Sequence, residues 1–192
     1  MTETINIIHK INTELEKRNI QPNSAEAMRW LHQFITKNVK TFNPRQQFAL
    51  GERTVNPKPG FVYAYNYDPK YKDTLPYYDS FPLIMCLDVT KDGWTGINLH
   101  YIPPKVRSVL FGEMLEHLNN DKFNEQTKFK LTWGKLKLFA KHKFFKHAVK
   151  RYLTQPLGTP LFKITAHQWG ILVMLPTARF QKATAQQVWK DI

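Results

Sequence analysis

The sequence has little of three things: cysteine, long apolar runs, and acidic residues in its last third. Its one cysteine, Cys86, excludes an intramolecular disulfide framework and a zinc site built on several cysteines. The longest uncharged apolar stretch near the end, residues 169–175, is far shorter than the ~20 residues that a membrane-spanning helix needs. The first residues lack the basic region and apolar run of a secretory signal. We therefore expect one folded domain over residues 1–192, made in a cytoplasm and without a membrane segment.

Acidic residues are scarce in one part of the chain only. Residues 126–192 hold 13 lysines and arginines but a single acid, Asp191, whereas residues 1–125 hold 15 basic and 14 acidic residues. Nearly the whole net charge of +13 therefore lies in the last third. A segregated excess of this kind indicates a polyanionic partner. Nucleic acid is the first candidate and an anionic membrane surface the second, while a merely solvated helix face is the alternative without a partner.

The apolar pattern predicts helices at the start of the chain and a sheet after residue 60. Asn23, with Glu26 three residues later, has the spacing of a capping box and marks the start of the second helix. Aromatic residues then alternate with smaller ones over 61–67, which is typical of a strand. The expected helices are 3–19, one from about 24 to 40, one from 104 and 184–190, and the expected strands are 61–67, 81–89, 94–101, 161–165 and 170–175.

These elements predict an α+β fold. N-terminal helices are expected over 1–42, and a small antiparallel sheet over 60–104 and 160–176. Because the strands are short and the turns tight, an SH3-like barrel is the preferred arrangement of the sheet. Residues 104–153 are expected to form a helical insertion with a basic face.

The basic segment, residues 135–153, is the strongest functional signal. Taken as one helix, it places Leu138, Phe145, Ala148, Val149 and Tyr152 on an apolar stripe, with lysines and a histidine on the opposite side. Stacked like charges repel each other, and phosphates of a duplex would relieve that repulsion and release counterions. The expected nucleic-acid-binding residues are Lys135, Lys137, Lys141, Lys143, Lys146, His147, Lys150 and Arg151.

Three carboxylates close together suggest a metal site as an alternative function. Asp68, Asp73 and Asp79 lie within twelve residues and could hold a divalent cation, as in nucleases. Aspartate is also an ordinary turn-forming residue, and Lys70 and Lys72 can neutralise these side chains. We therefore expect a rigid structural loop here and no metal.

Other candidate residues also have structural interpretations. Tyr77 and Tyr78 could stack on bases, but such tyrosines more often pack in a core or a loop. His100 is expected to be a hydrogen-bonded core residue, and Cys86 a small buried hydrophobe. The sequence contains no glycine-rich phosphate loop and no zinc-protease motif. No catalytic residue and no cofactor is expected.

Two unusual blocks, Leu75-Pro-Tyr-Tyr-Asp79 and Asn98-Leu-His-Tyr101, carry a family resemblance. With the stretches 59–83 and 93–107 around them, they resemble a family of proteins from T-even-like tailed phages and their marine relatives. Three further stretches fit the same pattern more loosely: 150–153, 175–180 and 188–191, with Trp169 nearby. The resemblance covers about 60–190 and leaves the N-terminal helices outside it.

The family is that of the DNA end protector, a virion protein that sits on the ends of packaged DNA. It shields these ends from the host RecBCD exonuclease after injection. The resemblance therefore implies double-stranded DNA ends as the ligand, the virion and the host cytoplasm as locations, and no catalytic residue. The host exonuclease and other virion proteins are the further partners to consider. The alternatives are a structural virion component (head completion, neck or tail) that meets packaged DNA or an acidic protein, and a small nuclease.

A preference for ends needs more than charge, because lysines bind the middle of a duplex as well as its terminus. Aromatic side chains can stack on an exposed terminal base pair. The candidates in the basic region are Trp133, Phe144 and Tyr152. The sequence therefore predicts DNA binding that depends on position and is independent of base sequence.

Overall fold

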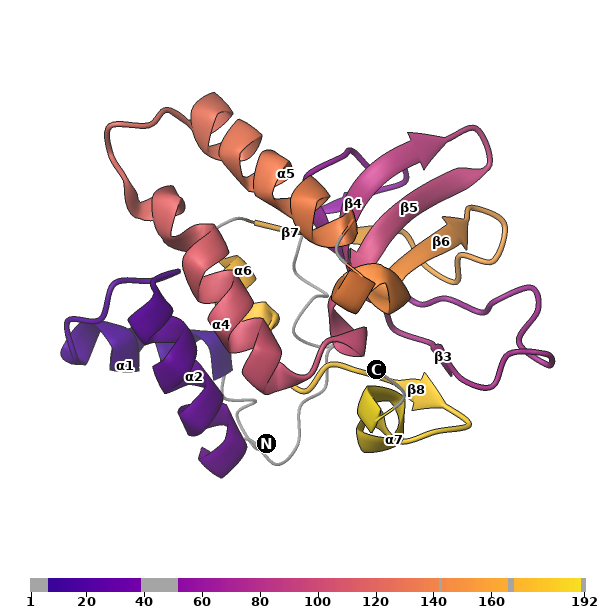
Figure 1. The fold of residues 1–192 in the computed structure, drawn as a ribbon, viewed down its shortest axis with the longest axis horizontal. Helices are drawn as coiled ribbons and strands as arrows, with labels where there is room; N and C mark the ends of the chain where they lie inside the picture. Colours follow the sequence, from indigo (N-terminus) through magenta and orange to yellow (C-terminus); the bar gives the residue numbers. More distant parts are fainter. Residues whose placement is uncertain (1–6, 39–51, 142, 166–167, 191–192) are drawn as a thin grey trace, which may run out of the picture.

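The fold combines helices with an antiparallel sheet, which confirms the predicted α+β class (Figure 1). The computed structural model describes residues 7–38, 52–141, 143–165 and 168–190, without the side chains of residues 125, 129, 143 and 144. The helices are α1 (Ile7–Lys17), α2 (Ala25–Asn38), η1 (Leu99–Tyr101), α4 (Pro104–Leu115), η2 (Glu116–Asn119), α5 (Glu125–Lys141), η3 (Lys143–Ala148), α6 (Trp169–Leu172) and α7 (Ala185–Lys190). The strands are β1 (Arg53–Thr54), β2 (Val62–Ala64), β3 (Tyr78–Asp79), β4 (Leu83–Thr90), β5 (Gly93–Asn98), β6 (Val149–Leu153), β7 (Leu161–Ile164) and β8 (Phe180–Gln181).

The main sheet has six strands in the order β1-β7-β2-β4-β5-β6, and all its described pairs are antiparallel. Strands β3 and β8 form a separate pair beside it. In the described sheet β1 and β6 are the two edges and do not pair with each other. The sheet is therefore open, and the preferred SH3-like barrel is not closed.

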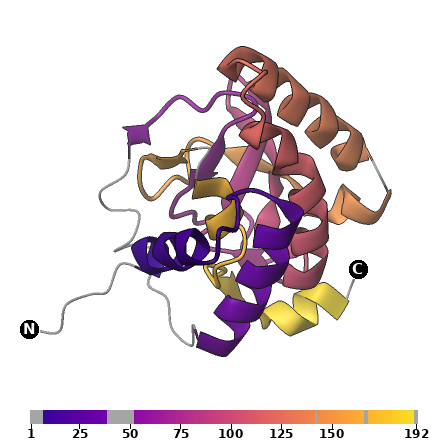
Figure 2. The same cartoon turned by 90° about the vertical axis from the view of Figure 1, so that its left-hand side faces the viewer.

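Alternation along β2 divides the buried residues between the two faces of the sheet. Val62 and Ala64 belong to the larger apolar cluster, which also contains residues of α1, α2, α4 and α6. Tyr63 and Tyr65 belong to a smaller cluster with Trp94 on the other face. The predicted aromatic face over 61–67 is thus confirmed. Figure 2 shows α4 and α5 together on one side of the molecule.

The N-terminal helices form as expected, but the predicted cap is wrong by one residue. The Ser24 hydroxyl, not Asn23, accepts the hydrogen bond from the Ala27 amide at 3.0 Å. Asn23 has a positive φ of 58°, and its side chain accepts a hydrogen bond from the Gly170 amide instead. The last residues of the expected range 1–42 lie outside the described part.

Three predicted elements differ in the structure. The expected strand 94–101 ends at Asn98, and Leu99–Tyr101 form the short helix η1. The apolar run 170–175 is not a strand: its first residues lie in the short helix α6, which contacts α2 and α4. The basic segment 135–153 is not one helix, because it passes from α5 through η3 into strand β6. The last part of the expected insertion over 104–153 therefore belongs to the sheet. No described helix combines the length and the apolar character that crossing a membrane requires.

Candidate nucleic-acid interface

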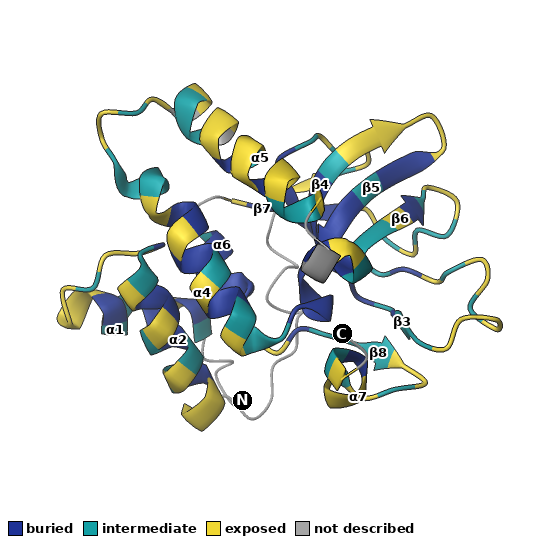
Figure 3. Ribbon diagram, viewed as in Figure 1, coloured by how far each residue is buried: buried dark blue, intermediate teal, exposed yellow. Residues whose placement is uncertain are grey.

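Helix α5 presents a row of lysines to solvent. Leu136 points into the larger apolar cluster and is 2% exposed. Lys135, Lys137 and Lys141 are exposed on the other faces, and the outer side of α5 is coloured as exposed in Figure 3. Leu138 is 71% exposed, so the predicted apolar stripe is wrong at this position. The exposed side of α5 is therefore basic and is available to a polyanion.

Lys135, Lys137 and Lys141 of α5 form no ion pair with a carboxylate among the residues that the structure describes. Lys137 Nζ lies 4.8 Å from the centroid of the Trp133 ring, a cation–π contact. Lys135 Nζ donates a hydrogen bond to the Glu113 carbonyl oxygen at 3.2 Å. Neither contact neutralises the positive charge. Trp133 is half-buried beneath Lys137, and it remains a candidate for stacking.

The remaining predicted contacts lie beyond α5 and have different surroundings. Lys146 of η3 is exposed. His147 Nε2 lies 3.0 Å from the Tyr101 carbonyl oxygen, so its N–H donates to the backbone and anchors η3 to η1. The side chains of Lys143 and Phe144 lie outside the described part of the chain. Of the predicted binding residues whose side chains the structure describes, Lys135, Lys137, Lys141 and Lys146 are exposed without an ion pair to a described carboxylate.

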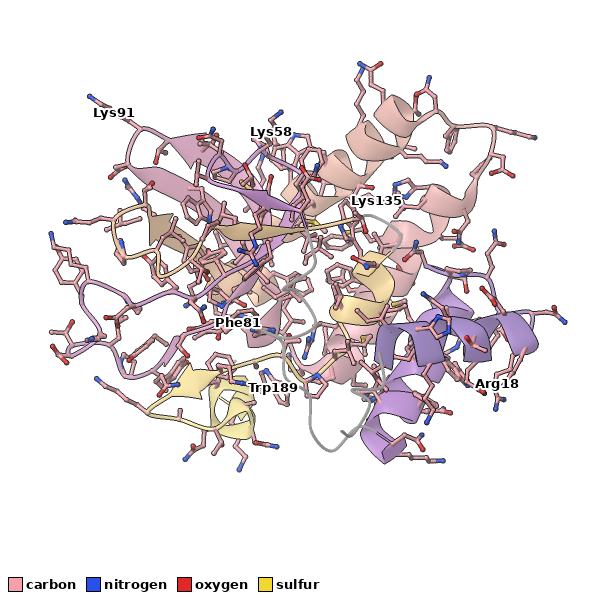
Figure 4. All side chains as sticks on the ribbon, turned by 180° about the vertical axis from the view of Figure 1, so that it is seen from behind. Arg18, Lys58, Phe81, Lys91, Lys135 and Trp189 are labelled. Atoms are coloured by element: carbon pink, nitrogen blue, oxygen red, sulfur yellow. The ribbon has the colours of Figure 1, made fainter. Side chains whose placement is uncertain are left out.

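Arg151 has an acidic partner on the neighbouring hairpin. Its Nη2 donates to both carboxylate oxygens of Asp92, at 2.8 and 2.7 Å. Asp92 lies in the two-residue turn between β4 and β5, next to Lys91 at the hairpin tip (Figure 4). Hydrogen bonds from Thr90 and from Arg151 hold the pKa of the Asp92 carboxyl below its ordinary value. The charge of Arg151 is therefore largely compensated.

Tyr152 is a correction to the predicted end-stacking set. Its side chain is 5% exposed, and its ring centroid lies 5.6 Å from that of Tyr65 in an edge-to-face arrangement. Its hydroxyl accepts a hydrogen bond from Asn98 Nδ2 at 2.9 Å. On strand β6, which pairs with β5, Tyr152 points into the smaller apolar cluster. It cannot stack on a terminal base pair in this position.

A buried polar network lies beside this cluster and is centred on Asp79. The Asp79 carboxylate accepts hydrogen bonds from His100 Nδ1 at 2.6 Å and Asn98 Nδ2 at 3.1 Å. It also accepts from the backbone amides of Phe81 and Arg179, at 3.0 and 3.2 Å. The bond to Phe81 is the turn interaction expected for an aspartate, but the other three join distant parts of the chain.

His100 continues the network to a third segment. Its Nε2 lies 2.5 Å from the hydroxyl oxygen of Thr177, so the buried histidine predicted from the sequence is confirmed. Asp79, His100 and Thr177 come from the three blocks 75–79, 98–101 and 175–180 that carried the family resemblance. The blocks are far apart in sequence and meet in one hydrogen-bonded group. Asp79 and His100 were expected to be structural residues, whereas no role was expected for Thr177, and the meeting of the three was not predicted.

The order carboxylate, imidazole, hydroxyl is that of a nucleophilic triad. Here, however, His100 and Thr177 are 0% exposed and Asp79 is 4% exposed. Burial alone would raise the pKa of the Asp79 carboxyl, but the charge and hydrogen bond of His100 outweigh it, and this pKa is lowered. No substrate can approach the Thr177 hydroxyl in this arrangement, so the group fastens three segments together.

The other residues considered for a metal site or for catalysis do not form a common site among the described residues. Asp68 forms an ion pair with Lys72 at 2.8 Å, while Asp79 is held by His100. Among the described residues, no group of three His, Cys, Asp or Glu side chains is placed to hold a metal ion. Cys86 is buried as predicted, and burial raises the pKa of its thiol to about 12.

A cavity of about 510 Å³ lies between the loop that precedes β3 and strand β6. Tyrosine is the most frequent residue in its walls, with six of the fourteen lining residues, and two lysines also line it. The lining residues are Tyr67, Pro69, Lys70, Tyr71, Leu75, Tyr77, Tyr78, Asp79, Asp92, Tyr101, Lys150, Arg151, Tyr152 and Leu153. Tyr77 and Tyr78 were expected to pack in a core or a loop, and this cavity could not be expected from the sequence, because residues some 70 positions apart form it.

Lys150 lines this cavity rather than the outer surface. Its Nζ lies 4.3 Å from the centroid of the Tyr101 ring, and burial lowers the pKa of its ammonium group. No described carboxylate is within ion-pair distance of it. The predicted basic residues are therefore divided between an exposed row, mainly on α5, and the aromatic cavity beside β6.

Comparison with known proteins supplies the family. The family model of the phage T4 terminal DNA protecting protein matches residues 2–192, including the N-terminal helices that the resemblance left outside. No curated protein and no solved structure matches the chain. A match over nearly the whole length confirms the resemblance: the chain belongs to the phage T4 terminal DNA protecting protein family.

Proposed function

We propose that this protein binds the ends of double-stranded DNA without sequence specificity and shields them from a host exonuclease of the RecBCD type. The observation that carries the proposal is the family match over residues 2–192. The exposed lysines of α5 supply a surface for the phosphate backbone. Double-stranded DNA ends are therefore the main proposed partner, and the host exonuclease and other virion proteins are further ones.

The chemistry of the basic surface supports binding without base readout. Lysines act as point charges on phosphates, which fix the position of the protein but carry no base information. Arg151 is the predicted contact best suited to bidentate recognition of guanine, and its guanidinium is occupied by Asp92. A surface of this kind favours contacts with the DNA backbone.

We further propose that protection is steric and involves no catalysis. The one triad-like group that the described residues contain, Asp79–His100–Thr177, is closed to substrate by its burial. The family description, DNA protection, agrees with this interpretation. Magnesium-dependent cleavage of DNA or RNA by the purified protein would contradict it.

The proposed locations are the virion and then the host cytoplasm, where injected ends meet exonuclease. A structural virion component that merely contacts packaged DNA or an acidic protein is the second candidate. It is favoured by the same basic surface, because α5 would suit any polyanion. An end-protecting protein should protect DNA ends in solution as a free protein, whereas a structural virion component should not.

A nuclease-protection assay on linear duplex tests the proposal. The protein is mixed with end-labelled linear DNA and with either a RecBCD-type exonuclease or an unrelated exonuclease, and label release is followed. We expect slower release with both enzymes, and we expect closed circular DNA, added as competitor, to leave the protection in place. Protection limited to the RecBCD-type enzyme would instead indicate contact with the nuclease, and no protection would favour the structural virion component.

A further inference from the structure

We propose that the cavity beside β6 binds the terminal nucleotide of one DNA strand, with its base among the tyrosines and its phosphate at Lys70 and Lys150. The inference rests on the proposed function and specifies which part of the DNA end is recognised. It also replaces the end-stacking role that burial denies to Tyr152.

The size and position of the cavity suit one nucleotide. Its volume of about 510 Å³ lies within the usual range of small-ligand sites, roughly 300–1,000 Å³. It lies between strand β6 and the loop that extends beside it in Figure 1. The cavity is too small for a base pair with its backbones, so it requires an unstacked, unpaired base.

The walls offer aromatic surface to such a base. Tyr71 is 63% exposed at the rim, which is unusual for a large aromatic side chain. Tyr77 lies deeper, with its ring centroid 6.1 Å from that of Tyr101. Aromatic side chains stack on any base, because every base has a π-face. Recognition in this cavity would therefore be independent of sequence, in agreement with the lysine contacts of α5.

The charges around the cavity favour a phosphate. Lys70 Nζ lies 5.4 Å above the Tyr71 ring and Lys150 Nζ 4.3 Å above the Tyr101 ring, and neither has an ion-pair partner among the described carboxylates. The two acids that line the cavity are engaged elsewhere, Asp79 with His100 and Asp92 with Arg151. Two uncompensated ammonium groups therefore remain beside an aromatic surface.

This arrangement explains how an end could be told from the middle of a duplex. A base inside a duplex must be unstacked before it can enter a pocket, which costs a few kcal/mol, whereas an already single-stranded base enters at least cost. A frayed or overhanging terminal nucleotide meets that condition. The lysines of α5 would hold the adjacent duplex, and the cavity would hold its last nucleotide.

The test compares the affinity for two duplexes of equal length in the full-length protein and three variants. One duplex carries a one-nucleotide overhang at its ends, and the other is a relaxed, covalently closed circle, which has neither ends nor unpaired bases. The variants are Tyr71→Ala, Lys150→Gln and, as a control of equal charge change, Lys10→Gln on α1, at the far side of the molecule (Figure 1). Thermal unfolding of each variant checks that the fold is kept, and the exposure of Tyr71 makes its variant the safest.

We expect the ratio of open-end to closed-circle affinity to fall about tenfold or more in Tyr71→Ala, since stacking on one aromatic contributes that much. Lys150→Gln should lower the ratio too, and Lys10→Gln should keep it. A second measurement places 5-iododeoxyuridine in the overhang and locates the photo-crosslink, which we expect within residues 67–78 or at Tyr101.

The outcomes separate the two proposals. If the unmodified protein does not prefer the open duplex, end binding itself is contradicted. If the unmodified protein prefers the open duplex, but both cavity variants keep this preference and the crosslink lies elsewhere, only the cavity assignment is overturned. That second result would also be expected of a cavity that serves a protein partner.

Discussion

Asp79 joins three segments that are far apart in the sequence. Its carboxylate is 4% exposed and is bonded to His100, Asn98 and two backbone amides. Removing this carboxylate leaves several buried donors without an acceptor, and each buried polar group left unpaired costs about 1–3 kcal/mol. The role of this residue is therefore structural, and its loss should be felt throughout the fold.

We expect Asp79→Ala to lower the free energy of unfolding by about 3 kcal/mol or more, because His100, Asn98 and two backbone amides lose their acceptor. Denaturant titration measures this change. Asp73→Ala is the matched control, since Asp73 is an exposed aspartate of the same loop and should change the free energy by about 0.5 kcal/mol or less. Equal effects of the two substitutions would contradict the assignment of Asp79 as the centre of the network.

The Asp79 carboxylate should also make the free energy of unfolding depend on pH. The pKa of Asp79 is lowered from its ordinary value of 3.8, because His100 and the hydrogen bonds outweigh the opposing effect of burial. A carboxyl with a lowered pKa in the folded state adds stability that is present above its unfolded pKa and is lost as the pH falls through the folded pKa. We therefore expect the unfolding free energy to decrease below about pH 4, and to decrease less steeply in Asp79→Asn. Parallel curves for the two proteins between pH 2 and 6 would show that another group is responsible.

Asp92 allows a gain-of-binding test. Asp92→Asn keeps a turn-forming side chain before Gly93 but removes the charge that compensates Arg151. We expect DNA affinity at fixed salt to increase about two- to fivefold, since one more cation then meets phosphate at the modest value of an exposed charge contact. Asp88→Asn on β4 removes the same charge without freeing an arginine and should increase affinity less. Fluorescence anisotropy with labelled duplex measures both, and an unchanged or weaker affinity of Asp92→Asn would place Arg151 outside the interface.

At the scale of elements, α5 carries most of the predicted binding lysines that the structure shows as exposed. Lys135, Lys137 and Lys141 lie on it, and Lys146 follows in η3. If these four lysines meet phosphates, the logarithm of the binding constant should fall with the logarithm of salt concentration at a slope of roughly −3 to −4. The double variant Lys137→Gln/Lys141→Gln should reduce the magnitude of this slope by about 2.

The control for this experiment removes the same charge elsewhere. Lys10 lies on α1 and Lys58 on the loop before β2, and both are exposed. Lys10→Gln/Lys58→Gln lowers the net charge by as much as the α5 variant does. If the two double variants have the same slope, binding depends on net charge and not on α5.

The sequence predicted most elements but misassigned one critical segment. The apolar pattern and the turn residues from 61 to 101 determined the β2, β4 and β5 region, because alternate residues of these strands pack into the two apolar clusters on opposite faces of the sheet. The segment 149–153 fits a helical stripe equally well by spacing. Its pairing with β5 decides the outcome, and that pairing is a tertiary contact that periodicity does not report.

The same limit explains the run 170–175 and the aromatic cavity. A short apolar run is compatible with a buried strand or a buried helix, and contacts of α6 with α2 and α4 select the helix. The exposed lysines of α5 could be predicted from the sequence, because a local excess of basic residues is visible without knowledge of any tertiary contact. The cavity could not, since Tyr71 and Lys150 become neighbours of one space only after folding.

For the whole molecule, the two proposed contacts with DNA follow each other along the chain. The lysines of α5 and the cavity beside β6 belong to consecutive parts of the chain, linked by η3. A long duplex offers the lysines many equivalent positions, but it offers the cavity a nucleotide only at its terminus. Affinity would therefore come mainly from α5, and position from the cavity.

The most direct test of this account is competition between linear and covalently closed circular DNA. A labelled linear duplex is bound at moderate salt, and unlabelled linear or relaxed closed circular DNA of equal base content is added. The account predicts that linear DNA displaces the probe at a concentration of ends at which the circular form displaces little of it. Equal competition by the two forms, base for base, would show that ends are not recognised and would contradict the account.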